Sequence, residues 1–201
     1  MKKYSLICYL FIVIFFSFSH AQIQMKKNPA VNFTTIVQAG ILEGQADKTF
    51  GQFQLVNGIQ YNAWFYGLGL GIDYYGAKRT VPLFLDVKAD LKKSGRTPFV
   101  YADAGYNFSW LRDGDKMTYW GTDYKTSGGL FYETGLGYKF TLKNKMAFGL
   151  SAGYSFKQHK EMYKRNIFMD FPPYNQPGYV QPYDIYDYQF RRISVKFNCS
   201  F

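Results

Sequence analysis

The last ten residues of the chain, RISVKFNCSF, alternate between polar and apolar side chains without a break. The apolar positions are Ile193, Val195, Phe197, Cys199 and Phe201. Because successive side chains of a β-strand point to opposite faces, this pattern predicts a strand with one apolar and one polar face. A strand that ends a chain needs a partner, and in a closed barrel that partner is the first strand. We therefore interpret residues 192–201 as the closing strand of an outer-membrane barrel.

Seven further segments alternate with the same period, so the chain is expected to contain eight strands. These segments cover residues 32–42, 51–61, 64–74, 81–91, 100–110, 130–140 and 146–156. The clearest of them is the third, from Trp64 to Tyr74. At roughly 3.3 Å per residue and a tilt of about 40°, it would span about 25 Å, which is the height of the apolar band of a transmembrane barrel.

The connections between these segments also alternate in length. Short turns are expected at 62–63, 92–96 and 143–145, and mostly longer loops at 43–49, 76–79, 112–127 and 164–182. Both ends of the barrel domain fall on the side of the short turns, as in outer-membrane barrels. The expected fold class is therefore all-β: an eight-stranded antiparallel up-and-down transmembrane β-barrel with short periplasmic turns and longer extracellular loops.

The start of the chain predicts a secretory signal peptide. Two lysines precede an apolar run at 6–18, and a small residue, Ala21, precedes Gln22, so cleavage is expected between these two residues. The apolar run is short for a membrane-anchoring helix, which needs about 20 residues. We expect a signal peptide at 1–21, a barrel domain at 22–201, and export to the outer membrane of a Gram-negative cell.

Composition limits the possible partners. The formal net charge is +10, but the basic residues form no stripe and an exported protein does not meet nucleic acid. Outer-membrane lipids and the phosphates of lipopolysaccharide are the expected acidic neighbours. No second segment has the length and apolar character of a transmembrane helix, and a chain that crosses a bilayer without one must form a closed barrel. Once the signal peptide is removed, Cys199 has no second cysteine with which to form a disulfide.

We interpret the apolar face as the lipid-facing one. It carries five or six large side chains on most strands, too many for the narrow interior of eight strands. The alternative is a secreted barrel of the lipocalin type, with its apolar residues inside around a ligand.

On the lipid-facing interpretation, the polar face lines the lumen. Buried charges persist when they are paired, so we expect the charged residues of this face to form a network that plugs the bore. They are Asp73, Asp86, Lys88, Asp90, Asp103, Glu133, Lys139, Lys157, Arg192 and Lys196. Aromatic residues at the strand ends are expected to form girdles at the two membrane interfaces. They are Tyr61, Trp64, Tyr74, Trp110, Phe156 and Phe201.

Catalysis has one candidate side chain, His159, the only histidine after the predicted cleavage site. By alternation it faces inward with Ser155 and Glu161, and a Ser–His–acid arrangement is one way to activate a serine. This spacing matches no known motif, and a histidine at a strand end is more often a polar rim residue. No paired metal ligands, phosphate loop or dinucleotide fingerprint is present. We therefore expect no enzyme activity, no cofactor and no metal.

The signal peptide, the eight amphipathic strands and the terminal aromatic residue resemble the small outer-membrane β-barrel superfamily. This superfamily includes the transmembrane domain of OmpA and the OmpX-, OmpW- and PorT-like proteins. Strands rich in Gly and Tyr, such as GLGLGIDYYG at 67–76, are similar to barrel proteins common in Bacteroidota. The resemblance rests on pattern, so it assigns no functional residues. We expect a monomer that reaches the membrane through the barrel-assembly machinery, which would recognise its C-terminal strand.

Three functions are compatible with this sequence. The first is a structural or surface-interaction role carried by the extracellular loops, of which 164–182 is rich in aromatic residues and prolines. The second is a narrow channel or transporter for a small or hydrophobic solute. The third is an enzyme that modifies lipid A.

Overall fold

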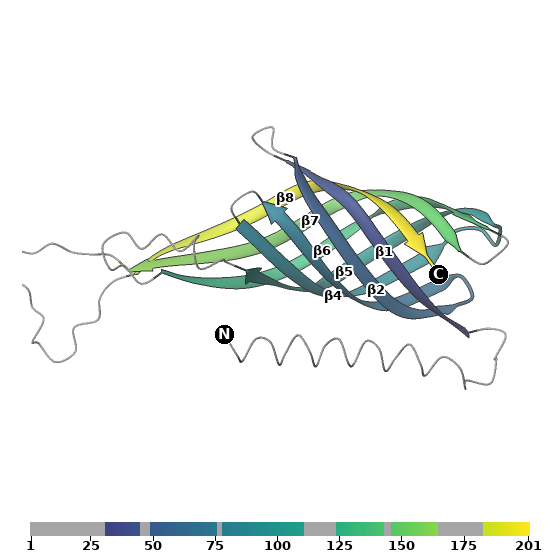
Figure 1. Ribbon diagram of the computed structural model, residues 1–201, viewed down its shortest axis with the longest axis horizontal. Helices are drawn as coiled ribbons and strands as arrows, with labels where there is room; N and C mark the ends of the chain where they lie inside the picture. The colour runs from purple at the N-terminus through teal and green to yellow at the C-terminus, as the bar shows by residue number, and fades with distance from the viewer. Residues whose placement is uncertain (1–30, 45–48, 76–77, 111–123, 143–145, 165–182) are drawn as a thin grey trace, which may run out of the picture.

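The computed structural model describes residues 31–44, 49–75, 78–110, 124–142, 146–164 and 183–201. The predicted signal peptide, with its cleavage site at Ala21 and Gln22, lies outside the described residues, as does most of the last long loop. Eight antiparallel strands close into a barrel, in which each pairs with the next and the last pairs with the first (Figure 1). The strands are β1 (Val31–Gly44), β2 (Phe50–Tyr61), β3 (Trp64–Tyr75), β4 (Lys78–Asp90), β5 (Arg96–Trp110), β6 (Tyr124–Thr141), β7 (Ala147–Lys164) and β8 (Tyr183–Ser200).

The predicted fold class, an all-antiparallel barrel of eight strands, is confirmed. Within the described ranges, no helix has the length and apolar character needed to cross a membrane. The C-terminus lies at the end of the barrel that carries the β2–β3 turn (Figure 1). We call this the turn end and the opposite end the loop end.

The register of the strands sets their tilt. Starting at Thr34 and moving each time to the paired residue on the next strand, one goes once round the barrel. The path returns to β1 at Gly44, ten residues further along that strand. The residues passed on the way are Gly58, Gly67, Asp86, Asp103, Glu133, Ser155 and Arg192. For eight strands about 4.8 Å apart, an offset of this size gives a tilt of about 41°. A barrel of eight strands has an interior just wide enough to be filled by side chains.

Three strands extend furthest beyond the segments that the alternation predicts. β6, β7 and β8 have 18 residues each, and the additional residues lie at the loop end. β8 pairs with β1 as far as Arg192, whereas it pairs with β7 as far as Tyr183. The three strands therefore project beyond the others (Figure 1). In the projecting part of β8, YDIYDYQFR, the aromatic residues Tyr186, Tyr188 and Phe190 fall on the opposite row from Ile193 and Val195. The alternation therefore changes phase there, and the period-two pattern of the terminal segment stopped at Arg192.

The predicted loop at 76–79 is shorter than its predicted bounds, because β3 ends at Tyr75 and β4 already begins at Lys78. At the turn end, β2 and β3 are joined through Asn62 and Ala63, as predicted. Asn62 has a φ of 54°, in the left-handed region that asparagine adopts more readily than most residues.

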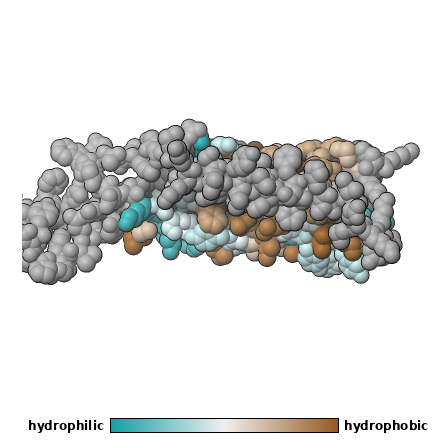
Figure 2. All heavy atoms as spheres, turned by 60° about the horizontal axis from the view of Figure 1, so that its bottom comes forward, coloured by the Kyte–Doolittle hydropathy of each residue, from teal (hydrophilic) through white to brown (hydrophobic). Residues whose placement is uncertain are grey.

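The apolar row of the strands faces outward. Leu83, Leu85 and Val195 are 39%, 63% and 43% exposed, whereas the side chains between such positions are mostly buried. Where the described residues are visible in Figure 2, apolar atoms lie along the outer surface of the barrel. This arrangement excludes the lipocalin-type alternative, in which the apolar row would line the interior.

Inward aromatic rings lie across glycines of the neighbouring strand. Phe84 is the Cα partner of Gly69, and Phe99 is the partner of Gly137. A Cβ atom added at either glycine would collide with the ring of its partner. Gly67 and Gly69 of the GLGLG string therefore make room for rings that fill the bore, where Phe84 packs edge-on against Phe131 with their centroids 5.2 Å apart.

We expect Gly69→Ala to lower the free energy of unfolding by about 1–3 kcal/mol, the usual cost of overpacking a filled core. Gly51→Ala is the matched control, because a Cβ atom there would meet nothing within 4 Å. That variant should stay within about 0.5 kcal/mol of the wild type. Urea unfolding in lipid vesicles measures both, and equal effects would contradict the packing described here.

Candidate functional site in the barrel lumen

Lys196 of β8 is the centre of the polar lumen. Its Nζ atom lies 2.7 Å from Oε1 of Glu133 on β6 and 3.6 Å from Oδ2 of Asp103 on β5. It also donates a hydrogen bond of 3.3 Å to the amide oxygen of Gln54 on β2. The side chain of Lys196 is only 1% exposed. One lysine thus connects four strands across the bore.

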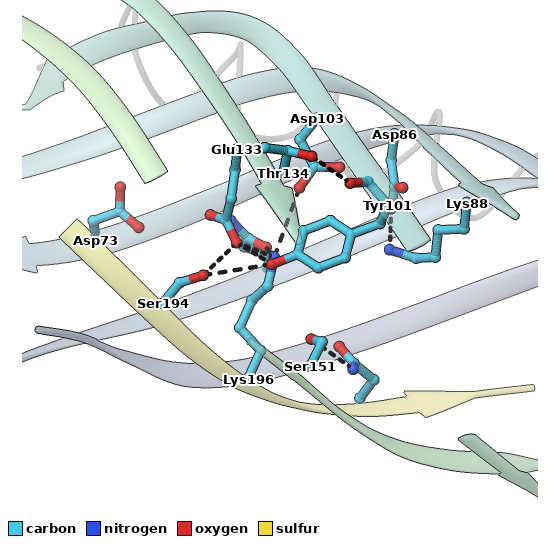
Figure 3. Close-up of polar contacts among 12 residues, drawn as sticks. Asp73, Asp86, Lys88, Tyr101, Asp103, Glu133, Thr134, Ser151, Ser194 and Lys196 are labelled. Atoms are coloured by element: carbon cyan, nitrogen blue, oxygen red, sulfur yellow. Dashed lines mark hydrogen bonds and ion pairs between the residues drawn. The ribbon is translucent and has the colours of Figure 1, made fainter. Parts of the chain in front are cut away.

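Glu133 is held by neutral donors as well as by Lys196. The hydroxyl groups of Tyr101 and Ser194 donate to its Oε1 at 2.8 and 2.6 Å, and Figure 3 shows these side chains converging on it. The ammonium group of Lys196 also lies 4.6 Å from the centre of the Tyr101 ring. An ionised carboxylate that is 1% exposed is stable in such surroundings because the cation and the hydroxyl groups replace its water shell.

Three carboxylates lie side by side in this part of the wall. Asp86, Asp103 and Glu133 are successive Cα partners on β4, β5 and β6. Lys88 contacts Asp86 at 2.6 Å, and Lys196 contacts the other two. Two lysines thus form ion pairs with three acids. Removing either lysine would leave buried carboxylates without a counter-charge.

Two further ion pairs extend the network along the bore. Towards the loop end, Nζ of Lys157 lies 2.6 Å from Oδ2 of Asp73, which also accepts a hydrogen bond of 3.1 Å from Thr80. Towards the turn end, Lys139 and Asp90 lie 2.7 Å apart, with 26% and 15% of their side chains exposed. The charges at the middle of the barrel are therefore enclosed, and those at the turn end reach solvent.

The structure brings most of the predicted lumen residues into this network, but it places Arg192 elsewhere. The Arg192 guanidinium lies near the loop end, 4.6 Å from the centre of the Phe50 ring and 5.4 Å from that of Tyr75. Four network members were not among the predicted charged residues: Gln54, Thr80, Tyr101 and Ser194. Alternation identifies each as inward-facing, but not its contacts.

The predicted girdle residues lie on the outward row. Five of them are 47–60% exposed: Tyr61, Trp64, Tyr74, Trp110 and Phe201. Phe156 differs, because it is only 8% exposed and its ring stacks on Tyr132 at a centroid distance of 4.8 Å. A cross-strand aromatic contact of this kind depends on register, which the single-strand pattern does not contain.

A small cavity of about 50 Å³ lies in the lumen near the turn end. Phe65, Lys88, Phe99, Lys139 and Asn198 are among the side chains that border it. In the part of the chain that the structure describes, no group of three or more His, Cys, Asp or Glu side chains is arranged to hold a metal ion.

Comparison with solved structures places this geometry among known folds. The crystal structure of the outer membrane protein OprG from Pseudomonas aeruginosa matches with a TM-score of 0.53 and 13% sequence identity, over 84% of this chain and 95% of OprG. The fold is that of an outer-membrane β-barrel. At this identity the match concerns the fold alone. No protein-family model matches the chain, and no curated protein matches its sequence.

Proposed function

We propose that this protein is an integral outer-membrane barrel with a plugged lumen, and that its role is structural or carried out by its extracellular loops. The observation that carries this proposal is the cross-section at Lys196. There the Glu133 and Asp103 ion pairs occupy the space that a solute would need, and the buried rings of Phe65 and Phe84 fill other parts of the same bore. A bore filled in this way supports anchoring or display at the surface rather than passage of solutes.

The same proposal implies which side of the membrane each end of the barrel faces. The turn end, with the C-terminus, would face the periplasm, where the barrel-assembly machinery would recognise β8. The loop end would face outward among lipopolysaccharide molecules, whose phosphates suit a chain with an excess of basic residues. Because the lumen is closed within one chain, we propose that the protein acts as a monomer.

The second candidate function is a narrow channel, which the cavity of about 50 Å³ near the turn end favours. Water could enter the bore there as far as Lys88, and a modest rearrangement around Lys196 would be needed to continue the path. The third candidate, modification of lipid A, has no outward-facing constellation among the described residues that favours it.

Planar-bilayer recording separates the first two candidates. We expect purified wild-type protein to give no stepwise current, because the ion pairs and aromatic rings block the bore. Stepwise currents whose size changes in Lys88→Gln or Lys196→Gln would contradict the plugged lumen and favour the channel. Heat-dependent migration on gels shows whether each sample contains a folded barrel.

Removal of residues 166–181 tests the role of the loops. This segment lies outside the described residues, and the strands on either side of it are β7 and β8. We expect the shortened chain to fold into the same barrel but to lose adhesion or partner binding measured on whole cells. Unchanged surface binding together with a defect in membrane integrity would favour a purely structural role.

A further inference from the structure

A serine, a histidine and a glutamate form a hydrogen-bonded chain at the loop end of the lumen. Oγ of Ser109 on β5 lies 2.7 Å from Nδ1 of His159 on β7. Nε2 of the same ring lies 3.1 Å from Oε1 of Glu161. His159 and Glu161 are each 1% exposed, whereas Ser109 is only half-buried. Alternation along β7 pointed to Ser155 as the serine near this histidine, but the barrel register brings Ser109 to it instead.

The glutamate fixes the direction of the hydrogen bonds. An ionised carboxylate can only accept, so the proton of a neutral His159 ring must sit on Nε2, facing Glu161. Nδ1 is then an acceptor, and the hydroxyl of Ser109 must donate to it. This is the protonation pattern that lets a histidine act as general base toward a serine, with the acid holding the ring in place.

The surroundings fit a substrate with an apolar part. The ring of His159 lies 6.2 Å from that of Tyr188 and 6.3 Å from that of Phe190. An open depression of about 460 Å³ lies along Gln189, Phe190, Arg191 and Arg192 of β8. Asn107 lies two residues before Ser109 on the same inward face. One N–H of its amide bonds to the Gln158 carbonyl at 3.3 Å, and an amide has a second N–H that could face a developing oxyanion.

We propose that Ser109, His159 and Glu161 form the nucleophile, base and positioning acid of a serine hydrolase that acts on carboxylic esters with an apolar acyl group. This activity goes beyond the anchoring or display role proposed above. Because Ser109 faces inward, on the row opposite to Trp110, the ester would enter from the loop-end mouth.

The reaction balances without a cofactor. Oγ of Ser109 bonds to the ester carbonyl carbon while its proton moves to Nδ1 of His159. The tetrahedral intermediate then expels the alcohol, which takes that proton as its carbon–oxygen bond breaks. Water repeats the sequence on the acyl-serine, releasing the carboxylic acid and restoring Ser109. Glu161 accepts from the ring throughout and stabilises the imidazolium.

An alkyl fluorophosphonate is the direct probe, because the same attack forms an Oγ–P bond and expels fluoride. We expect the full-length protein in outer-membrane vesicles to become labelled, and peptide mass spectrometry to place the phosphonate on Ser109. Ser109→Ala should abolish labelling, and His159→Gln should slow it by roughly 100-fold or more. Glu161→Gln should also slow it, with partial rescue by Glu161→Asp, which a merely structural role would not produce.

Ser155→Ala is the matched control, because Ser155 is an inward serine on β7 with no part in the proposed site. That variant should label like the wild type. Heat-dependent gel migration confirms the folded barrel in each variant, and the mapping of the wild-type label does not depend on any variant folding. Absence of label on the folded wild type, or label on a residue other than Ser109, would overturn the proposal. Release of butyrate from p-nitrophenyl butyrate would indicate a soluble ester, whereas fatty acid release from phospholipid vesicles alone would indicate a membrane lipid.

Discussion

Lys196→Met should lower the free energy of unfolding of the barrel by about 3–5 kcal/mol, the usual cost of removing one partner of a buried ion pair. The ammonium group lies 2.7 Å from Glu133 and 3.6 Å from Asp103, and all three side chains are at most 1% exposed. Methionine fills a similar volume but supplies no charge. Two carboxylates would then remain in a bore where the hydroxyl groups of Tyr101 and Ser194 are the main remaining donors to Glu133.

Lys139→Met is the matched control for this prediction. Lys139 also pairs with an acid, Asp90 at 2.7 Å, but 26% of its side chain is exposed at the turn end. Water can replace the lost partner there, so the cost should stay below about 1 kcal/mol. Urea titration in lipid vesicles measures both values. The double variant Lys196→Met with Glu133→Gln should lose less free energy of unfolding than the two single variants together. The reason is that Glu133→Gln removes a carboxylate charge that Lys196→Met leaves without a counter-charge. Additive losses would contradict the direct ion pair.

Alternation was sufficient to predict which way most side chains face. It assigned Asp73, Asp86, Asp103 and Glu133 to the lumen and Leu83, Leu85 and Val195 to the outer surface, and the exposed fractions agree with both assignments. The reason is that a closed barrel has an apolar environment only on its outside, so each side chain points either to that apolar outside or to the polar lumen. Where a strand projects beyond the barrel, as β8 does from Tyr183 to Arg191, that constraint is absent and the alternation changes phase.

The contacts between inward residues could not be predicted in the same way. They depend on the register of all eight strands, because a long side chain such as Lys196 reaches strands two or three positions away. Ser109 illustrates the point, since 50 residues separate it from the histidine to which it bonds. The stacking of Phe156 on Tyr132 has the same origin. Short turns of known length fix some registers, but the offset around a whole barrel accumulates over every connection.

Leu85→Arg should destabilise the folded barrel by about 2–4 kcal/mol in lipid vesicles, the cost of an arginine on the lipid-facing surface near the middle of a bilayer. Leu85 is 63% exposed and belongs to the outward row at the centre of β4. A polar substitution at a position this exposed would be nearly neutral in a water-soluble protein, because water would solvate the guanidinium. The size of the loss in free energy of unfolding therefore shows whether lipid or water surrounds the outward-facing apolar residues.

Leu91→Arg is the matched variant that shows how the cost of an arginine depends on its depth in the membrane. Leu91 is 59% exposed, almost the same fraction as Leu85, but it follows the last residue of β4 at the turn end. An arginine there can reach the headgroups and water, so its cost should fall to about 0–1 kcal/mol. Denaturant titration of both variants in the same vesicles gives the difference directly. Equal and small losses would mean that Leu85 meets water, and the outward apolar row would then need another partner than lipid.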